Sequence, residues 1–580
     1  MKQYFLPILL MMTLLATPTL AQKRDVKISI IETSDVHGRI FPYDFAQNTP
    51  AEGSLSRVAT YVNQLRKHQG HSNVALLDNG DLLQGELTTY YFNYEDTKSP
   101  HLAARALNHL DYLCTNLGNH DIEIGRKAYD RFMNDCAMVN LGANVFDTEV
   151  GRLYLTAYMM EEIDGVRVGV IGLTTPTIPQ WLPQHLWKGL DFRDMIATAH
   201  RVVPIIRRAG KADIVIALVH SGAGPANSQE KMMDNASIQL AEQVPGIDVV
   251  FCGHDHKIAN QIVYNKGTGN PVILLNPGSN ATHVAQADLH VTLNKGKVVS
   301  KNIEGMVVDV RPYEPDAHFL SEFEKDFLAV KQYAERVVGT NAHEIDSRIS
   351  LFGSSAFVDV IHKLQLDLTG ADISFSAPLL LDTRIPEGDI RISDLFNLYR
   401  YENQLAVIQM SGTEIKRYLE ESYGQWTQQM KSPTDNMLLF HPDAENCKAP
   451  WERLQHSNYN FDSAAGIKYT VDLSKPKGQK IRITALANGR PFDLNRNYRV
   501  ALNSYRACGG GNLLTKGAGI PQAQLKSRVI KTIDKDLRQL LIEEIQKTGK
   551  LKAEPLYNWR FIPEGWAANA SERDAQLLFK

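Results

Sequence analysis

Short hydrophobic runs recur through the first half of the chain, separated by longer stretches of mixed polarity. Most are continuous, as in strands buried on both faces, whereas residues 26–30 alternate as in a half-buried strand. We therefore predict six strands, at residues 26–30, 74–77, 112–114, 214–219, 249–252 and 272–275. Apolar residues at helical spacing predict helices between them, at residues 55–67, 101–110 and 194–208. Alternating strands and helices are typical of a layered α/β domain, which we expect over residues 25–310.

The pattern changes near residue 310. From Ala317 the sequence predicts a charged helix with a phenylalanine stripe, so residues 316–338 are expected to form a linker helix. A mixed α+β domain is expected over residues 339–565, and residues 566–580 are expected to form a surface tail. The helices predicted in this domain are residues 356–368 and 412–421, and the strands are 404–409, 468–472, 481–486 and 498–503.

The first 21 residues have the pattern of a secretory signal peptide. Lys2 precedes a mostly apolar stretch, and the small residues Thr19 and Ala21 precede a predicted cleavage site. We therefore expect a periplasmic or secreted protein. No later stretch reaches the length of a membrane span, so no integral membrane segment is expected after cleavage.

Composition narrows the function classes. A chain of 580 residues is too long for one hydrophobic core, which favours two domains. The net charge of −3 gives no basic surface for a nucleic-acid polymer. Five cysteines exclude a disulfide framework; Cys114 and Cys252 are predicted as buried thiols, and a single disulfide remains open. We expect a monomer.

Polar clusters follow the predicted strands of the first domain. Because strand ends line the binding crevice of such sheets, these side chains are expected to meet at one edge. The clusters are Asp35-x-His37, Gly80-Asp81, Gly118-Asn119-His120-Asp121, His220 and Gly253-His254-Asp255-His256. Asp, Asn and His are ligands for a pair of transition-metal ions. Without thiolates they favour Mn, Zn, Co or Fe over Ca or Mg, and the sequence does not choose among the four.

The spacing within the clusters suggests how the ligands are arranged. On an extended chain alternate side chains face the same way, so Asp35 with His37, and His254 with His256, are expected to point together. Asp81 is the expected bridging carboxylate. Two close ions can activate a water molecule and hold a phosphoryl oxygen, so we interpret the chain as a phosphoesterase that uses a metal-activated hydroxide.

In these motifs the chain resembles the secreted 5′-nucleotidases and 2′,3′-cyclic-nucleotide 2′-phosphodiesterase/3′-nucleotidases. The resemblance implies a calcineurin-like metallophosphoesterase domain, a four-layer sandwich of two sheets flanked by helices, followed by a nucleotidase C-terminal domain that binds substrate. It also implies two metal sites that share Asp81. The ligands of one would be Asp35, His37, Asp81 and His256, and those of the other Asp81, Asn119, His220 and His254.

The same resemblance places His120 beside the ions, where it would stabilise or protonate the phosphoryl group. Many members carry an aspartate three residues after this histidine, and here that position is Glu123. Asp121, directly after His120, is the other candidate. Glu123 is favoured because its longer side chain can still reach the imidazole.

In the second domain, the Gly370–Phe375, Ile392–Phe396 and Asn503–Arg506 stretches carry the resemblance. Family members hold the base between two aromatic rings. Tyr505 is the candidate for one of them, and Tyr459, with Phe461 as alternative, for the other.

The chain departs from 5′-nucleotidases at one motif. Their Asn-Gly-Gly-Gly-Ile-Arg is replaced by Ser376–Leu381, which removes the arginine that meets the substrate. Arg384 and Arg506 are candidate replacements. The stretch around Arg506 resembles the cyclic phosphodiesterase branch more closely, so the phosphate position, 5′ or 2′/3′, stays open.

The function expected from these features is phosphate removal from nucleotides. Alternatives are hydrolysis of UDP-sugars or other phosphoesters on the same scaffold, and a non-catalytic surface protein that binds nucleotides. A nuclease is disfavoured because the chain lacks a basic groove.

Overall fold

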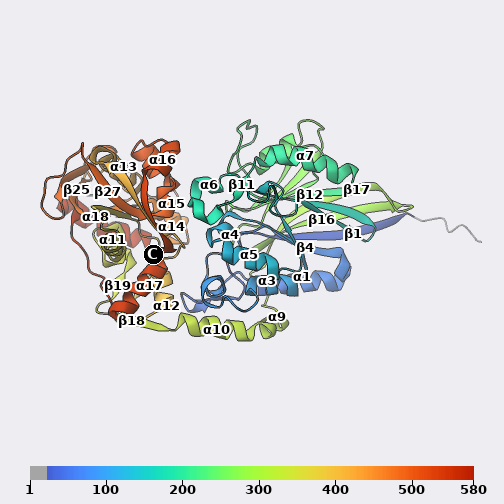
Figure 1. The fold of residues 1–580 in the computed structure, drawn as a ribbon, viewed down its shortest axis with the longest axis horizontal. Coiled ribbons are helices and arrows are strands. Elements are labelled where there is room, and N and C mark those ends of the chain that lie inside the picture. Colours follow the sequence, from blue (N-terminus) through green and yellow to red (C-terminus); the bar gives the residue numbers. More distant parts are fainter. Residues whose placement is uncertain (1–22) are drawn as a thin grey trace, which may run out of the picture.

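The computed structural model describes residues 23–580, so the predicted signal peptide lies outside the described residues. Figure 1 shows two parts side by side. We call residues 24–309 the N-terminal domain and residues 337–578 the C-terminal domain. Helices α9 (Ala317–Glu322) and α10 (Glu324–Ala334) connect them along one edge of the molecule.

Two six-stranded mixed sheets face each other in the N-terminal domain. In order across the first sheet, the strands are β17 (Lys297–Asp309), β16 (His283–Asn294), β1 (Arg24–Thr33), β4 (Val74–Asp78), β5 (Tyr112–Asn116) and β6 (Val139–Leu141). In the second they are β14 (Ala259–Tyr264), β15 (Pro271–Asn276), β13 (Val249–Cys252), β12 (Ile214–His220), β10 (Val166–Thr174) and β9 (Tyr158–Ile163). All six predicted strands are present within these sheets.

The hydrophobic positions divide into three layers around the sheets. Ile28 and Leu77 of the first sheet and Ile216 and Phe251 of the second form one core between them. The helices that cover the outer face of the first sheet are α1 (Leu55–Gln69), α3 (Leu102–His109) and α5 (Arg126–Asp135). Those on the outer face of the second are α7 (Met195–Arg208) and α8 (Ser237–Gln243). The predicted four-layer arrangement is confirmed.

The connector differs from the single helix that the sequence predicts. The helix breaks at Phe323, whose backbone leaves the helical region (φ −105°, ψ 16°). Phe319 and Phe323 are both buried, and their rings pack edge-on against His109 of α3. The predicted apolar stripe therefore anchors the connector to the N-terminal domain, and strand β18 (Val337–Asn341) begins before the predicted end of the helix.

The C-terminal domain is mixed α+β, as expected. Its five-stranded sheet has the order β24 (Ser463–Ala465), β20 (Ile373–Ser376), β27 (Asn497–Asn503), β23 (Gln404–Ser411) and β28 (Val529–Asp536). A second sheet contains β26 (Ile481–Leu486), β25 (Ile467–Asp472) and β30 (Trp559–Ile562). A third contains β22 (Gly388–Arg391), β18 and β29 (Lys550–Leu551). The two predicted helices appear as α11 (Ala356–Thr369) and α13 (Gly412–Trp426).

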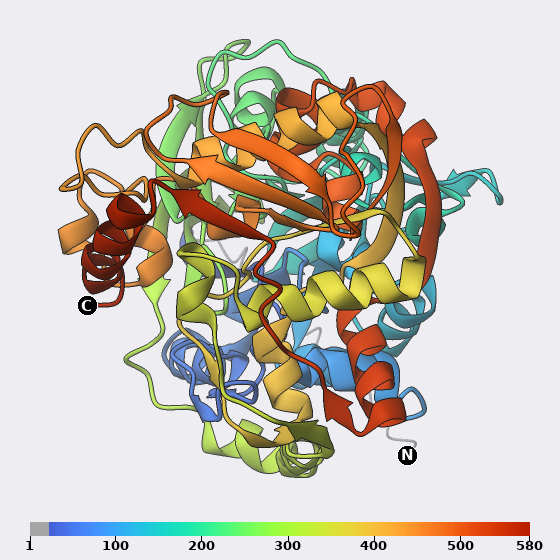
Figure 2. The same ribbon diagram turned by 90° about the vertical axis from the view of Figure 1, so that its left-hand side faces the viewer.

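The last residues form helix α18 (Glu564–Leu578) rather than the expected surface tail. In Figure 2 it is the dark red helix at the edge of the C-terminal domain. Ala570, Asp574 and Leu578 are buried on one side of it. The Asp574 carboxylate accepts hydrogen bonds from the backbone N–H groups of Met437 and Leu438, both at 2.8 Å, so the helix is anchored by a buried polar contact.

The five cysteines are all unpaired in residues 23–580, and Cys114 and Cys252 are buried as expected. Within the same residues, each helix is too short or too polar to cross a bilayer.

Candidate metal centre

The candidate ligands lie where strands of both sheets end. Asp35 and His37 follow β1, Asp81 follows β4, and His220 is the last residue of β12, which is buried along its whole length. Two backbone hydrogen bonds continue beyond the strands. Asp35 N donates to Gly80 O (3.0 Å) and His37 N to Asp81 O (2.9 Å), so the first two ligand loops are held in register.

The sequence analysis expected an extended backbone at the ligand pairs, with alternate side chains on one side. The backbone of these ligands is left-handed instead, so the reason given for their common direction was wrong. Asp35, His37, Asp81, His254 and His256 all have φ between 49° and 70°. Non-glycine residues adopt such values rarely, and their clustering is typical of functional loops.

The glycines of the motifs allow these loops to approach closely. A Cβ atom on Gly118 would lie 2.1 Å from Asp81 Oδ1. One on Gly253 would lie 2.0 Å from Ser34 Oγ and 2.6 Å from Asp35 Oδ2. Side chains at these two positions would displace the candidate ligands.

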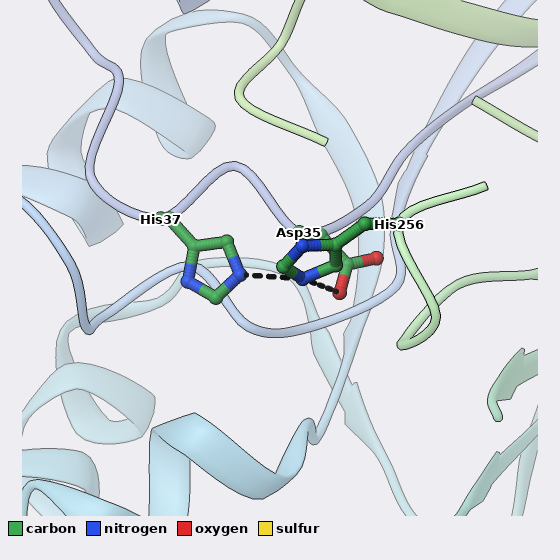
Figure 3. A group of neighbouring side chains, drawn as sticks. All are labelled: Asp35, His37 and His256. Atoms are coloured by element: carbon green, nitrogen blue, oxygen red, sulfur yellow. Dashed lines mark hydrogen bonds and ion pairs between the residues drawn. The ribbon is translucent and has the colours of Figure 1, made fainter. Parts of the chain in front are cut away.

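Asp35, His37 and His256 form the first cluster, drawn in Figure 3. His256 Nε2 lies 3.0 Å from His37 Nε2 and 3.3 Å from Asp35 Oδ1. His37 Nδ1 donates to the carbonyl oxygen of Gln84 at 3.0 Å, so its Nε2 presents a lone pair to the cluster. Burial alone would raise the pKa of Asp35, but its contact with His256 lowers that pKa to about 2.

Asp81, His220 and His254 form the second cluster, with Asn119 beside them. His220 Nδ1 donates to the carbonyl of Asn79 (2.8 Å). Its Nε2 therefore faces Asp81 Oδ2 at 3.1 Å and Asn119 Oδ1 at 3.2 Å. His254 Nδ1 lies 2.8 Å from the same amide oxygen.

These donor sets fit cations. Nδ1 of His37 and Nδ1 of His220 each donate to a backbone carbonyl. In the neutral imidazole, Nε2 then carries the lone pair and faces the other acceptors of its cluster. Asp81 Oδ2 is buried and accepts no hydrogen bond within residues 23–580. Burial alone would lower the pKa of His220, but the facing Asp81 carboxylate raises it to about 10, so a cation that binds here would have to displace a proton from Nε2. Imidazole, carboxylate and amide donors suit Mn, Zn, Co or Fe.

Asp234 is a site residue that the sequence analysis missed. Its Oδ2 lies 3.0 Å from His254 Nε2, so the carboxylate holds the N–H of that ring and directs Nδ1 to the cluster. Its Oδ1 accepts hydrogen bonds from the hydroxyls of Thr175 (2.9 Å) and Thr177 (2.5 Å). Asp234 lies in a loop without hydrophobic periodicity, and no local sequence signal marks it.

His120 lies beside the first cluster, with its ring 5.5 Å from that of His37 between centroids. Its Nδ1 is 2.5 Å from Glu123 Oε2, whereas its Nε2 has no hydrogen-bond partner in residues 23–580. Burial lowers the pKa of His120, but Asp81 and Glu123 together raise it to about 10. Glu123, the favoured candidate, is therefore the carboxylate that contacts His120.

Asp121, the other candidate for the carboxylate that orients His120, binds backbone N–H groups instead. Its two carboxylate oxygens accept four backbone hydrogen bonds, at 2.8–3.0 Å, from Gly118 and from residues 81–83. Asp121 thus fixes the loop that carries Asp81 and is not free to orient His120.

Two of the aromatic candidates share a surface of the C-terminal domain. Tyr459 and Tyr505 meet edge to face, with ring centroids 6.4 Å apart and an interplanar angle of 80°. Tyr505 packs over Gly510, where a Cβ atom would lie 2.4 Å from the ring. Tyr401, which belongs to a stretch that also carries the family resemblance but was not predicted as a site residue, lies near them. Burial raises its pKa, and the neighbouring Arg400 opposes this.

Phe461, the alternative to Tyr459, is not available to a ligand. Its side chain is fully buried in the core of the C-terminal domain and stacks on Trp426 at 5.7 Å between centroids. Tyr459 is 38% exposed, so of the two alternate residues it is the one that faces outward.

The two candidate arginines have other contacts. Arg506 is buried, and its guanidinium binds the Asp462 carboxylate (2.9 and 3.2 Å) and the backbone carbonyls of Tyr459 and Gly510. Arg506 thus supports the aromatic pair and has no group left for phosphate. Arg384 pairs with Asp346 at 3.2 Å and lines a cavity of about 820 Å³ that none of the candidate metal ligands lines. Arg506 is therefore not available to a phosphate, whereas the role of Arg384 in substrate binding stays a prediction.

Comparisons with known proteins agree with this geometry. The family model described as calcineurin-like phosphoesterase matches residues 28–258, and that of the 5′-nucleotidase C-terminal domain matches residues 337–516. The chain is 28% identical to a 2′,3′-cyclic-nucleotide 2′-phosphodiesterase/3′-nucleotidase of Salmonella typhimurium, over 95% of this chain and 91% of that protein. It is 25% identical to one of Yersinia enterocolitica, over 94% and 89%. The crystal structure of a 5′-nucleotidase precursor from Thermus thermophilus has the same fold (TM-score 0.60, 21% identity, 93% and 100% covered).

Proposed function

Because the chain belongs to the 5′-nucleotidase and 2′,3′-cyclic nucleotide phosphodiesterase family, we propose that it removes phosphate from 3′-nucleotides and opens 2′,3′-cyclic nucleotides. It is a phosphoester hydrolase of the metallophosphoesterase family. One observation carries the proposal: two clusters of lone-pair donors lie next to a histidine–glutamate pair, with the His120 ring 5.5 Å from that of His37 between centroids.

We assign one divalent ion to Asp35, His37, Asp81 and His256, and a second to Asp81, Asn119, His220 and His254. When bound, such ions activate water for attack on phosphorus and neutralise the charge of the phosphoryl group. Mn, Zn, Co and Fe are the candidate metals.

The protein side chains contribute position and proton control. Glu123 holds Nδ1 of His120, which fixes the ring and directs Nε2 towards the space beside the first cluster. With a proton on each nitrogen, His120 can donate a hydrogen bond from Nε2 to a phosphoryl oxygen or to the leaving oxygen.

Tyr505 and Tyr459 are proposed to bind the base. Aromatic stacking on a base contributes about 1–3 kcal/mol and tolerates base identity.

The preference for 2′/3′ phosphates rests on two observations. The relative from Salmonella typhimurium aligns with nearly the whole chain and is a 2′,3′-cyclic-nucleotide 2′-phosphodiesterase/3′-nucleotidase. The Gly-Gly-Gly-Ile-Arg motif of 5′-nucleotidases is absent, Arg506 is occupied by protein acceptors, and Arg384 lines a cavity that none of the candidate metal ligands lines. With the signal pattern at residues 1–21, we further propose a monomeric periplasmic or secreted enzyme that acts on nucleotides outside the cytoplasm.

The test is phosphate release by the mature protein with Mn added. The substrates are 3′-AMP, 2′,3′-cyclic AMP, AMP and UDP-glucose; for the cyclic substrate, a phosphatase is added to detect the ring-opened product. We expect 3′-AMP and 2′,3′-cyclic AMP to be preferred. Asp81→Asn, which keeps the side-chain shape and removes the charge, should abolish turnover.

Three results would change the conclusion. Preference for AMP would identify a 5′-nucleotidase, and preference for UDP-glucose a sugar-nucleotide hydrolase on the same scaffold. Metal binding without turnover of any substrate would refute the enzymatic function and support a nucleotide-binding surface protein.

A further inference from the structure

Residues Gln84 and Gly85 touch a candidate metal ligand directly. His37 donates its Nδ1 hydrogen to the Gln84 carbonyl at 3.0 Å. Gly85 has φ of +128°, and a Cβ atom there would lie 2.9 Å from the Cβ of His37. The position of this short segment therefore determines where the His37 ring lies.

The same segment contacts the C-terminal domain. Gln84 Nε2 donates to Glu402 Oε2 at 2.5 Å across the boundary between the domains. Both residues are buried, Gln84 at 4% and Glu402 at 6% exposure. A buried hydrogen bond to a carboxylate is stronger than one between neutral groups, so this contact fixes the Gln84 side chain.

Glu402 is in turn held by Arg538, the second residue of α17 (Leu537–Thr548). The arginine Nη2 donates to Glu402 Oε1 at 2.5 Å, and Nη1 donates to the Tyr399 and Arg400 carbonyls at 3.2 and 2.9 Å. Because the positive and negative charges neutralise each other, the pair can stay buried.

The Arg538 guanidinium also lies between aromatic rings of the two domains. Its Cζ is 3.5 Å from the ring centroid of Phe396 on α12 (Ile392–Leu398) and 4.5 Å from that of Tyr90 in the N-terminal domain. Figure 1 shows α12 and α17 together on the side of the C-terminal domain that is nearest to the connector. Arg538 is fully buried there, so the Gln84–Glu402–Arg538 contacts are anchored in both domains.

We propose that Gln84, Glu402 and Arg538 are positioning residues that hold His37 towards the first ion, so that binding of this ion depends on how the C-terminal domain docks. The inference rests on the metal-dependent hydrolysis proposed above. None of the three residues contacts the reacting atoms: they act through the Gln84 carbonyl on a ligand of the ion.

The test removes the side-chain link and keeps the carbonyl. Gln84→Met preserves the volume of the side chain but cannot bind Glu402. Loss of a group that orients a metal-binding histidine costs roughly 10–100-fold in affinity, and for this more remote contact we expect about tenfold. Competition titration with a chelating dye and Mn or Zn, without substrate, should show one of the two equivalents weakened. Activity at limiting metal should fall and recover at high metal.

A matched control breaks another polar contact across the same boundary. Asn397 binds Gln47 Nε2 (2.5 Å) and the Ala46 carbonyl (2.8 Å), and it touches no candidate ligand. Asn397→Ala should leave both metal affinities unchanged. Gln84→Glu, which faces Glu402 with a second carboxylate, should weaken the same equivalent more than Gln84→Met does.

Wild-type affinity for both equivalents in Gln84→Met, with the variant folded by thermal melting, would overturn the inference. Equal weakening in Asn397→Ala would also overturn it, since general docking would then account for the effect. The titration is independent of turnover: a wild-type protein that binds two ions and hydrolyses no nucleotide refutes the proposed function alone.

Discussion

Asp234→Asn tests the assignment of the second metal site most directly. The carboxylate holds the N–H of His254 at 3.0 Å and is itself fixed by two threonine hydroxyls, so the imidazole is oriented before an ion arrives. Asparagine keeps the shape and removes the charge. The ring would then be free to present the wrong nitrogen.

The expected loss follows from this contact. Hydrogen bonds to charged groups contribute about 1.5–3 kcal/mol. Removal of a carboxylate behind a metal-binding histidine typically costs about 10–100-fold in affinity, which is about 1.4–2.7 kcal/mol. We expect the second equivalent of metal to weaken by that factor, while the first, which His37 and His256 contact, is unchanged.

The assay is a two-site competition titration with Co or Zn and a chelating indicator. Asp194→Asn is the matched control. Asp194 accepts from Met232 N at 3.0 Å and so anchors the same loop, and it caps α7 through Ala197 N, a role that asparagine retains. Unchanged affinity for both equivalents in Asp234→Asn would refute the assigned orientation of His254. A loss of the same size in Asp194→Asn would attribute the effect to the loop as a whole.

Three further predictions concern the neighbouring groups. Glu123→Gln should lower kcat by roughly 10²-fold or more at unchanged metal affinity, because His120 loses its charged partner; an unchanged kcat would exclude the pair from the reaction. Asp121→Ala should instead lower the melting temperature, since it leaves four backbone N–H groups without their acceptor at about 1–3 kcal/mol for each one that stays buried, and a stable variant would contradict this. Tyr505→Ala should raise KM for 3′-AMP by roughly 5–150-fold, corresponding to about 1–3 kcal/mol of lost stacking, whereas Tyr505→Phe should keep KM near wild type; equal KM values for both variants would exclude stacking.

The strands and the metal ligands could be predicted because their signals are local. The run from Ile214 to Val219 is continuous and apolar, and the structure places it as a buried strand that ends at His220. Asp, Asn and His residues that directly follow predicted strands can be recognised as candidate metal ligands from residue type and position alone. The choice between Tyr459 and Phe461 had no such signal, because it depends on Trp426, which packs against Phe461 from a distant helix.

Other features depend on contacts between segments far apart in the chain. Asp234 reaches His254 only because the loop folds back over the strand ends, and Gln84 meets Glu402 only across the domain boundary. Helix α18 did leave a signal. Ala567, Ala570, Asp574 and Leu578 follow a helical spacing, but the buried aspartate interrupts the apolar stripe and hides it.

The left-handed backbone of the ligand loops has a consequence for how the protein tolerates mutation. Each of the five candidate metal ligands with positive φ costs about 1–2 kcal/mol in conformational energy. Together this is of the same order as the whole stability of a typical domain, about 5–15 kcal/mol. Replacing one of them by glycine would therefore relieve strain while it destroys a ligand. Drift towards a more stable fold would erode the catalytic centre first, so only continued selection for activity preserves these residues.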